Sequence, residues 1–248
     1  MKSKVLPAVQ KWLLASIFVS GLSGTLAAQG LSLTEDKTKT EDGTEIEAWT
    51  ASLDQKEDYV RETFDKFIKQ EYGLKTDKRA KNILIVDKAK IVEISSLRGD
   101  LRGVFSPRGT STLVSFAFSP GYDIHLSKEA YPDELVRLGK IAKRYVKYHY
   151  NYYYKDLLAN TEKQIRDKQD DINKNTSRIS KAKSDIADNQ TKIDAGDKQT
   201  PKLTDRNRKS NESITSMETE NTNLQTEITQ LKESITQIQA SLKKVSEF

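Results

Sequence analysis

Apolar residues recur at regular intervals through the C-terminal part of the chain. One series repeats every seven residues: Leu158, Ile165, Ile172, Ile179, Ile186 and Ile193. A second series alternates spacings of three and four: Ile214, Met217, Asn221, Leu224, Ile228, Leu231, Ile235, Ile238, Leu242 and Val245. Such spacings are typical of coiled-coil helices. Gly196 and Pro201 between the two series mark a helix stop and restart. The pattern predicts a coiled-coil helical hairpin over 155–248 with its turn at 196–201.

Two long helices joined by a short turn must run antiparallel, so facing residue numbers have a constant sum. A sum of 396 brings apolar residues of both arms into the same layers. It also brings Asn175 opposite Asn221, and an Asn pair in an apolar seam fixes register at a cost in stability. Lys168 falls opposite Ile228, where its stem can lie along the seam with the charge outside.

The preceding segment, 49–154, has the mixed periodicities of a small α+β domain. Trp49, Leu53, Val60, Phe64, Phe67 and Ile68 share one helical face, and Gly73 is suited to cap that helix. Short β-branched or alternating runs then predict strands at 82–86, 91–95, 101–105, 112–119 and 122–126, with a turn at 107–109. A closing helix begins near Pro132 and has no Pro or Gly between Lys140 and Ala195. The fold class expected is therefore α+β: an antiparallel sheet with packed helices, followed by the hairpin.

The N-terminal residues predict export. Lys2, Lys4 and Lys11 precede an apolar core at 12–19, and small residues follow. This order is typical of a cleaved signal peptide over 1–28, with an uncleaved anchor as the alternative. Residues 29–48 are polar and charged, so they are expected to form a flexible leader.

Charge and cysteine content narrow the function classes. The chain has 41 basic and 36 acidic residues and no cysteine. Three basic residues lie in the signal, which leaves 38 against 36 and argues against a nucleic-acid partner. No further stretch is long and apolar enough for a stable membrane span. A cysteine-free exported chain fits a periplasmic or extracellular location.

Six tyrosines fall within Tyr145–Tyr154, a stretch that also holds His149. At 100° per residue, Tyr145, Tyr148 and Tyr152 face one side of the helix, and Tyr150 and Tyr154 face the other. The first set is expected to pack on the α+β domain and the second on the last turns of the hairpin. The domain joint is therefore assigned to Tyr145, Tyr148, Tyr152 and Tyr154. The alternative is a stacking surface for a ligand, helped by Lys147 and Lys155.

Candidate chemistry is sparse. Asp123 and His125 would share a strand face, but two ligands make no metal site without a third. Glu93, Asp100 and Asp123 are the candidates for an acid/base pair in an enzyme. Arg98-Gly99-Asp100 spells an adhesion tripeptide, for which a local turn is the simpler interpretation. Asn175, Asn189 and Asn211 begin glycan-acceptor triplets. No catalytic, cofactor or metal residue is therefore assigned.

The predicted hairpin tip is basic. Residues 196–209 contain two acidic residues, Asp197 and Asp205, and five basic ones. The basic residues are Lys198, Lys202, Arg206, Arg208 and Lys209. A projecting basic tip can bind an anionic surface or an acidic partner, whereas the plain alternative is a solvated turn.

Together these features favour an exported, non-catalytic interaction or scaffolding protein of a bacterial envelope. Its coiled coil would bind a protein partner or self-associate. The alternatives are a periplasmic holdase-like chaperone and a glycan-acting enzyme.

Overall fold

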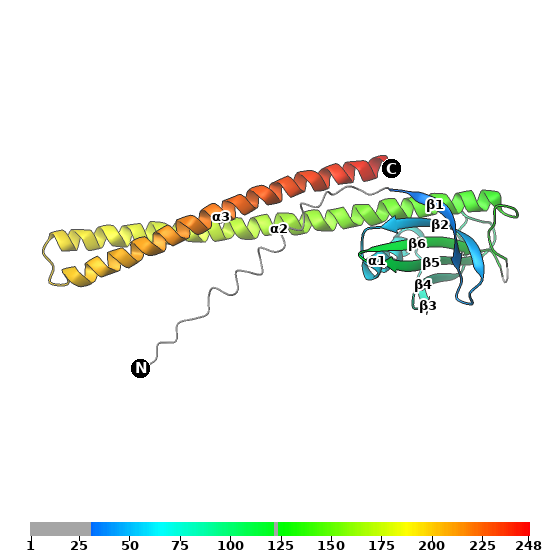
Figure 1. Cartoon of the computed structure of the whole chain (residues 1–248), viewed down its shortest axis with the longest axis horizontal. Coiled ribbons are helices and arrows are strands. Elements are labelled where there is room, and N and C mark those ends of the chain that lie inside the picture. The colour runs from blue at the N-terminus through cyan, green and yellow to red at the C-terminus, as the bar shows by residue number, and fades with distance from the viewer. Residues whose placement is uncertain (1–30, 122–123) are drawn as a thin grey trace, which may run out of the picture. The chain divides into compact units, whose positions relative to one another are not determined.

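The computed structural model describes residues 31–121 and 124–248 (Figure 1), so the predicted signal peptide at 1–28 lies outside the described residues. The described chain divides into two compact units. One is the hairpin unit, Asp156–Ala240, and the other, the α+β unit, contains the chain up to Lys155 together with Ser241–Phe248. The mixed α+β class predicted from the sequence is confirmed by six strands and three helices in the described residues.

The sheet of the α+β unit is antiparallel throughout, in the order β1-β2-β6-β5-β4-β3. Its strands are β1 (Leu33–Lys39), β2 (Glu45–Leu53), β3 (Asp77–Ala80), β4 (Ile83–Ala89), β5 (Gly99–Arg108) and β6 (Ser111–Ser119). The two strands predicted on either side of a turn at 107–109 do pair with each other, as β5 and β6. Their pairing continues through Pro107 and Arg108. The turn therefore falls at Gly109, whose φ of 64° suits glycine.

Helix α1 (Glu57–Tyr72) and the first part of α2 (Pro132–Asp194) cover the same face of this sheet. Trp49 and Gly103 both pair with Phe116, so the three residues share that face. A Cβ atom at Gly103 would lie 2.7 Å from the Phe64 ring of α1. A Cβ atom at Gly139 of α2 would lie 2.6 Å from the Trp49 ring. Helix and sheet thus approach closely where glycine replaces a side chain.

The N-terminal expectations were wrong in two places. The leader predicted at 29–48 contains β1 and the start of β2, because Leu33–Lys39 pairs along its whole length with Glu45–Ala51. The helix predicted from Trp49 starts only at Glu57; Trp49 and Leu53 belong to β2. Their spacing of four also fits a strand, in which residues an even number apart share a face. Gly73 does cap α1, in a left-handed conformation with its N–H donating to Lys69 O.

Two further segments predicted as strands, 91–95 and 122–126, are not strands in the structure. Residues 91–95 form a helical turn, since the N–H groups of Ile94 and Ser95 both bond to Ile91 O. This turn buries Ile91 and Ile94 from positions three apart. Within 122–126 the described residues contribute only an isolated bridge from Ile124 to Gly121. The charged strand β3 was not expected.

The long helices match the predicted hairpin. Helix α2 is uninterrupted for 63 residues, and α3 (Thr200–Glu247) follows after a short turn. Gly196, with φ 75°, donates its N–H to Ile193 O, and Asp197 N–H bonds to Lys192 O. This paired arrangement is a Schellman motif, which satisfies carbonyl groups at a helix end.

The register of the two arms agrees with the predicted sum of 396, but the expected pair of Asn175 and Asn221 forms no hydrogen bond: Asn175 Nδ2 and Asn221 Oδ1 are both buried without a partner in the described chain. Asn189 Nδ2 donates to Asn207 Oδ1 at 2.9 Å, and these numbers have that sum. Lys168 was expected opposite Ile228 with its charge outside the seam. Its ammonium group pairs with Glu227, the residue before Ile228, which agrees with that position. The most buried seam residues lie mainly on α3: Leu203, Ile214, Leu224, Ile228, Leu231 and Ile238.

Candidate functional site

The tyrosine cluster begins with Tyr145, which is completely buried in the α+β unit. Its ring lies 5.2 to 5.6 Å from the rings of Phe64, Phe67 and Phe116. Its hydroxyl donates to Val60 O at 2.8 Å. Burial raises the pKa of this phenol well above its ordinary value, so Tyr145 stays neutral. The residue is part of the core.

His149, one turn further along α2, is also fully buried. Its Nδ1 lies 2.7 Å from Thr63 Oγ1, and its Nε2 lies 2.7 Å from Gln55 Oε1. Burial lowers the imidazole pKa to about 3. A neutral ring that donates from Nε2 to the Gln55 oxygen and accepts from Thr63 satisfies both nitrogens. Both ring nitrogens of His149 therefore have partners inside the α+β unit.

Tyr148 and Tyr152 stack with a ring separation of 6.2 Å on the α1 side of the helix. Tyr148 also lies 5.5 Å from Phe67. The Lys66 ammonium stands 4.3 Å from the Tyr152 ring centre and pairs with Glu62. Both tyrosines therefore contact α1, on the side that the sequence predicted.

Tyr150 and Tyr154 stack on each other at 6.0 Å. Tyr154 hydrogen-bonds the Ser241 side chain, as expected for a residue facing the end of α3. Tyr150, however, bonds to Asp54 in the connection between β2 and α1. Tyr150 therefore also faces the β2–α1 connection, a contact that the sequence did not predict.

The last turns of α3 belong to the same unit as this cluster. Lys147 Nζ donates to Ser246 O at 2.8 Å, and the Lys143 ammonium lies 4.7 Å from the Phe248 ring centre. Val245 is almost completely buried. The tyrosine rings are thus occupied by contacts within the protein, which favours the joint over a ligand-stacking surface.

The five cations predicted for partner binding are all exposed near the hairpin turn. Arg208 pairs with Asp205 and Glu212, and Lys209 pairs with Asp205. Within the described residues, no ion pair involves Lys198, Lys202 or Arg206. These three cations carry the free positive charge of the tip.

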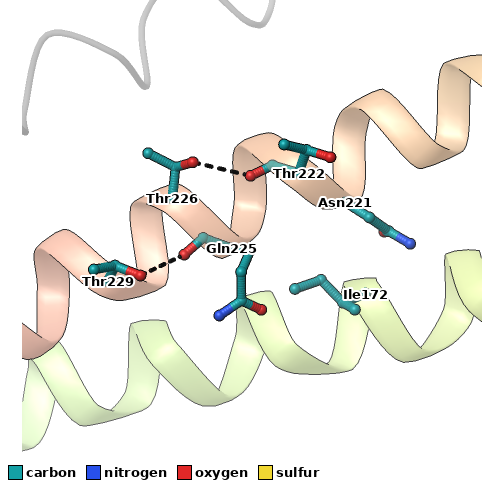
Figure 2. A pocket seen from close by; sticks show the side chains of 6 residues that line it. All are labelled: Ile172, Asn221, Thr222, Gln225, Thr226 and Thr229. Atoms are coloured by element: carbon teal, nitrogen blue, oxygen red, sulfur yellow. Dashed lines mark hydrogen bonds between the residues drawn. The ribbon is translucent and has the colours of Figure 1, made fainter.

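Two shallow grooves run along the hairpin. The first, of about 460 Å³, is polar and lies near the tip. It is lined by Asp185, Asp188, Asn189, Lys192, Arg206, Lys209 and Ser210. The second, of about 420 Å³, lies midway along the arms and is lined by Ile172 of α2 and by Asn221, Thr222, Gln225, Thr226 and Thr229 of α3. Figure 2 shows Asn221 and Gln225 turned toward α2 and the three threonines turned away from it. The first groove thus holds acidic and basic side chains, and the second is lined by one isoleucine and by amide and hydroxyl side chains.

Two of the three acidic residues considered for catalysis make contacts within the α+β unit. Glu93 pairs with Arg144 of α2. Asp100 accepts the backbone N–H of Lys88 at 2.8 Å and lies 3.5 Å from Arg102. The Asp100 carboxylate of the adhesion tripeptide is therefore engaged, and Gly99 is buried in β5. Asp123 lies outside the described residues.

A polar network on β5 and β6 was not found from the sequence. The buried Arg102 guanidinium makes two hydrogen bonds to Glu41 and donates to Ser119 Oγ at 2.8 Å. Ser119 Oγ lies 2.9 Å from His125 Nδ1. Arg102 lowers the pKa of Glu41. Because Glu41 is in the β1–β2 turn, the network ties that turn to the sheet, and no sequence signal connects residues so far apart.

Within the parts of the chain that the structure describes, no group of three or more His, Cys, Asp or Glu residues could hold a metal ion. Among the same residues, no helix is apolar and long enough to cross a membrane. Comparison with known proteins gave no matching family model, curated protein or solved structure.

Proposed function

We propose that this chain is an exported, non-catalytic interaction or scaffolding protein of a bacterial envelope, which presents a coiled-coil hairpin to a partner. One observation carries the proposal: α2 continues without a break from the α+β unit into the hairpin unit. The two units are therefore joined by helix and not by a Gly- or Pro-rich linker. The tyrosine cluster fixes the part of this helix that belongs to the α+β unit.

The tip is the partner-binding surface in this proposal. Lys198, Lys202 and Arg206 are exposed and free of ion pairs, so they are available to an anionic surface. The chain would work in the periplasm or outside the cell after signal cleavage. No cofactor or metal is required.

The test measures binding of the full chain to heparin and to phosphatidylglycerol vesicles, which separates an acidic glycan from a lipid surface. The variant replaces Lys198, Lys202 and Arg206 with Gln. Each basic residue near an anionic surface contributes about 1 kcal/mol, so binding should weaken by about 100-fold. The matched control replaces Lys163, Arg178 and Lys181, which are exposed on α2 far along the sequence from the tip.

Equal losses in the two triple variants would indicate non-specific charge and would refute the tip as the site. The chaperone alternative is separated by a second assay on the same protein. A holdase should suppress aggregation of an unfolded outer-membrane protein, whereas a scaffold should not.

A further inference from the structure

The first part of α2, within the α+β unit, carries positive charge and no negative charge. Residues 135–155 contain six basic residues and no acidic one. The basic residues are Arg137, Lys140, Lys143, Arg144, Lys147 and Lys155. The rest of α2, residues 156–194, contains eight acidic and eight basic residues. Mixed signs are typical of a solvated helix surface, so the first part of α2 differs in charge from its continuation.

Five of these bases lie on one side of the helix. At 100° per residue, the bases from Arg137 to Lys147 fall within an arc of roughly 120°. The buried residues Leu138 and Ala142 lie on the opposite side. Four of the five bases are exposed, and Lys147 is half-buried. This basic stripe consists of Arg137, Lys140, Lys143, Arg144 and Lys147.

Most of the charge of the basic stripe is not neutralised within the protein. Its two arginines pair with glutamates. In the described parts of the chain, no ion pair involves its three lysines. Lys143 lies over the Phe248 ring and Lys147 donates to a backbone carbonyl, and neither contact removes a charge. The three lysines are therefore available to an anionic partner.

Exposed aliphatic side chains accompany the basic stripe. Val136 falls within the same arc of the helix and is 53% exposed. Val92 is 68% exposed and precedes Glu93, which pairs with Arg144 of the stripe. The helical turn at 91–95 fixes Val92 on the outside, because the two isoleucines of this turn are buried. The exposure of Val92 is thus built into the fold.

The loop that carries Val92 adds further bases. Lys90 and Arg98 lie on either side of the turn, and both are exposed. Neither takes part in an ion pair with a described residue. Leu97, next to Arg98, is 52% exposed. Bases and aliphatic groups therefore occur together on two segments that an ion pair joins.

We propose that the basic stripe and the 90–98 loop bind the surface of an anionic phospholipid bilayer. Lipid phosphates pair with the lysines, whose aliphatic stems lie along the interface. The side chains of Val92, Leu97 and Val136 enter the boundary between headgroups and acyl chains. The inference goes beyond the proposed function, because it assigns a second binding surface, in the α+β unit, that does not involve the hairpin tip.

The composition of this surface favours lipid over other anionic partners. Lysine is depleted in protein–protein interfaces, since its ammonium group is strongly hydrated and its stem is flexible. A polyanion such as heparin needs only the charges and gains nothing from exposed valine and leucine side chains. A bilayer surface uses both the bases and the aliphatic groups.

The test uses the full chain in which the three tip cations are already replaced with Gln, so that the tip does not contribute. Co-sedimentation measures its binding to phosphatidylglycerol vesicles. Phosphatidylcholine vesicles give the part of the binding that does not depend on charge. Replacing Arg137, Lys140 and Lys143 with Gln in this protein should weaken binding to phosphatidylglycerol vesicles by about 100-fold.

The matched control removes the same charge from separate places on the α+β unit. It replaces Lys39, Lys56 and Arg108, which are exposed and far apart along the chain. This control should bind phosphatidylglycerol vesicles nearly as well as its parent. Equal losses in the two triple replacements would mean that the vesicles respond only to total charge, and the proposal would be overturned.

A second pair of replacements, Val92→Ser with Val136→Ser, separates lipid from a polyanion. The double variant keeps every charge, so it should bind phosphatidylglycerol vesicles about tenfold more weakly and heparin unchanged. Vesicle binding that is also unchanged would show a site for any polyanion and would refute the lipid assignment. The tip is tested by comparing the wild type with the tip variant, so failure of the tip is distinguishable from failure of the basic stripe.

Discussion

His149 is a buried base that must remain neutral for the α+β unit to stay folded. Its folded pKa is about 3, compared with an ordinary value of 6.5. Between these values the unfolded chain binds one more proton at this site, so stability falls as the pH is lowered through this window. The slope attributable to His149 should approach 1.4 kcal/mol per pH unit.

Urea unfolding of the wild type and of His149→Gln between pH 4 and pH 7 measures this slope. The variant loses the bond pattern to Thr63 and Gln55, so it should be less stable at pH 7 and should show a flatter pH dependence. The difference between the two slopes removes the contribution of other groups such as Glu41. Identical slopes would mean that the pKa of His149 does not differ between the folded and unfolded states.

At the scale of the elements, the hairpin register depends on a polar pair inside the seam. Asn207 is 9% exposed, and it accepts from Asn189 at 2.9 Å. Asn207→Ala leaves the Asn189 amide without its partner and should lower the free energy of unfolding by about 1–3 kcal/mol. Denaturation followed by circular dichroism measures the loss. Asn211→Ala, at an exposed position of the same helix, is the control and should change stability by less than about 0.5 kcal/mol.

The long elements could be predicted from the sequence because their signals repeat. Heptads and the Gly196–Pro201 break identified both arms, the turn and the register. Strand β1 was missed because an edge strand needs no apolar face, and its sequence, LTEDKTK, is polar like a disordered segment. The helical turn at 91–95 was missed because its β-branched residues suggest a strand.

Within the candidate site, the basic tip and the buried side of the tyrosine cluster could be predicted from charge and helical angle. The bond of Tyr150 to Asp54 could not, because it depends on the path of the β2–α1 connection. The bonds from Arg102 to Glu41 could not be predicted either, because Glu41 lies in the turn after β1, a strand that was missed. The periodicity of a sequence predicts single helices and strands. It does not predict these contacts, because each of them joins residues from different elements.

At the scale of the whole molecule, the chain returns to its first unit at its end, since Ser241–Phe248 belongs to the α+β unit. Val245 is 1% exposed there, whereas Lys244 beside it is exposed. Val245→Asp places a charge in this buried site and should destabilise the α+β unit by about 2 kcal/mol or more. Lys244→Asp is the matched control and should have little effect. Near-ultraviolet circular dichroism during heating reports the environment of the buried tyrosines, so the Val245→Asp variant should lose that signal at a lower temperature. If both variants melt like the wild type, the end of α3 does not stabilise the α+β unit, and the tyrosine cluster alone must hold α2 in place.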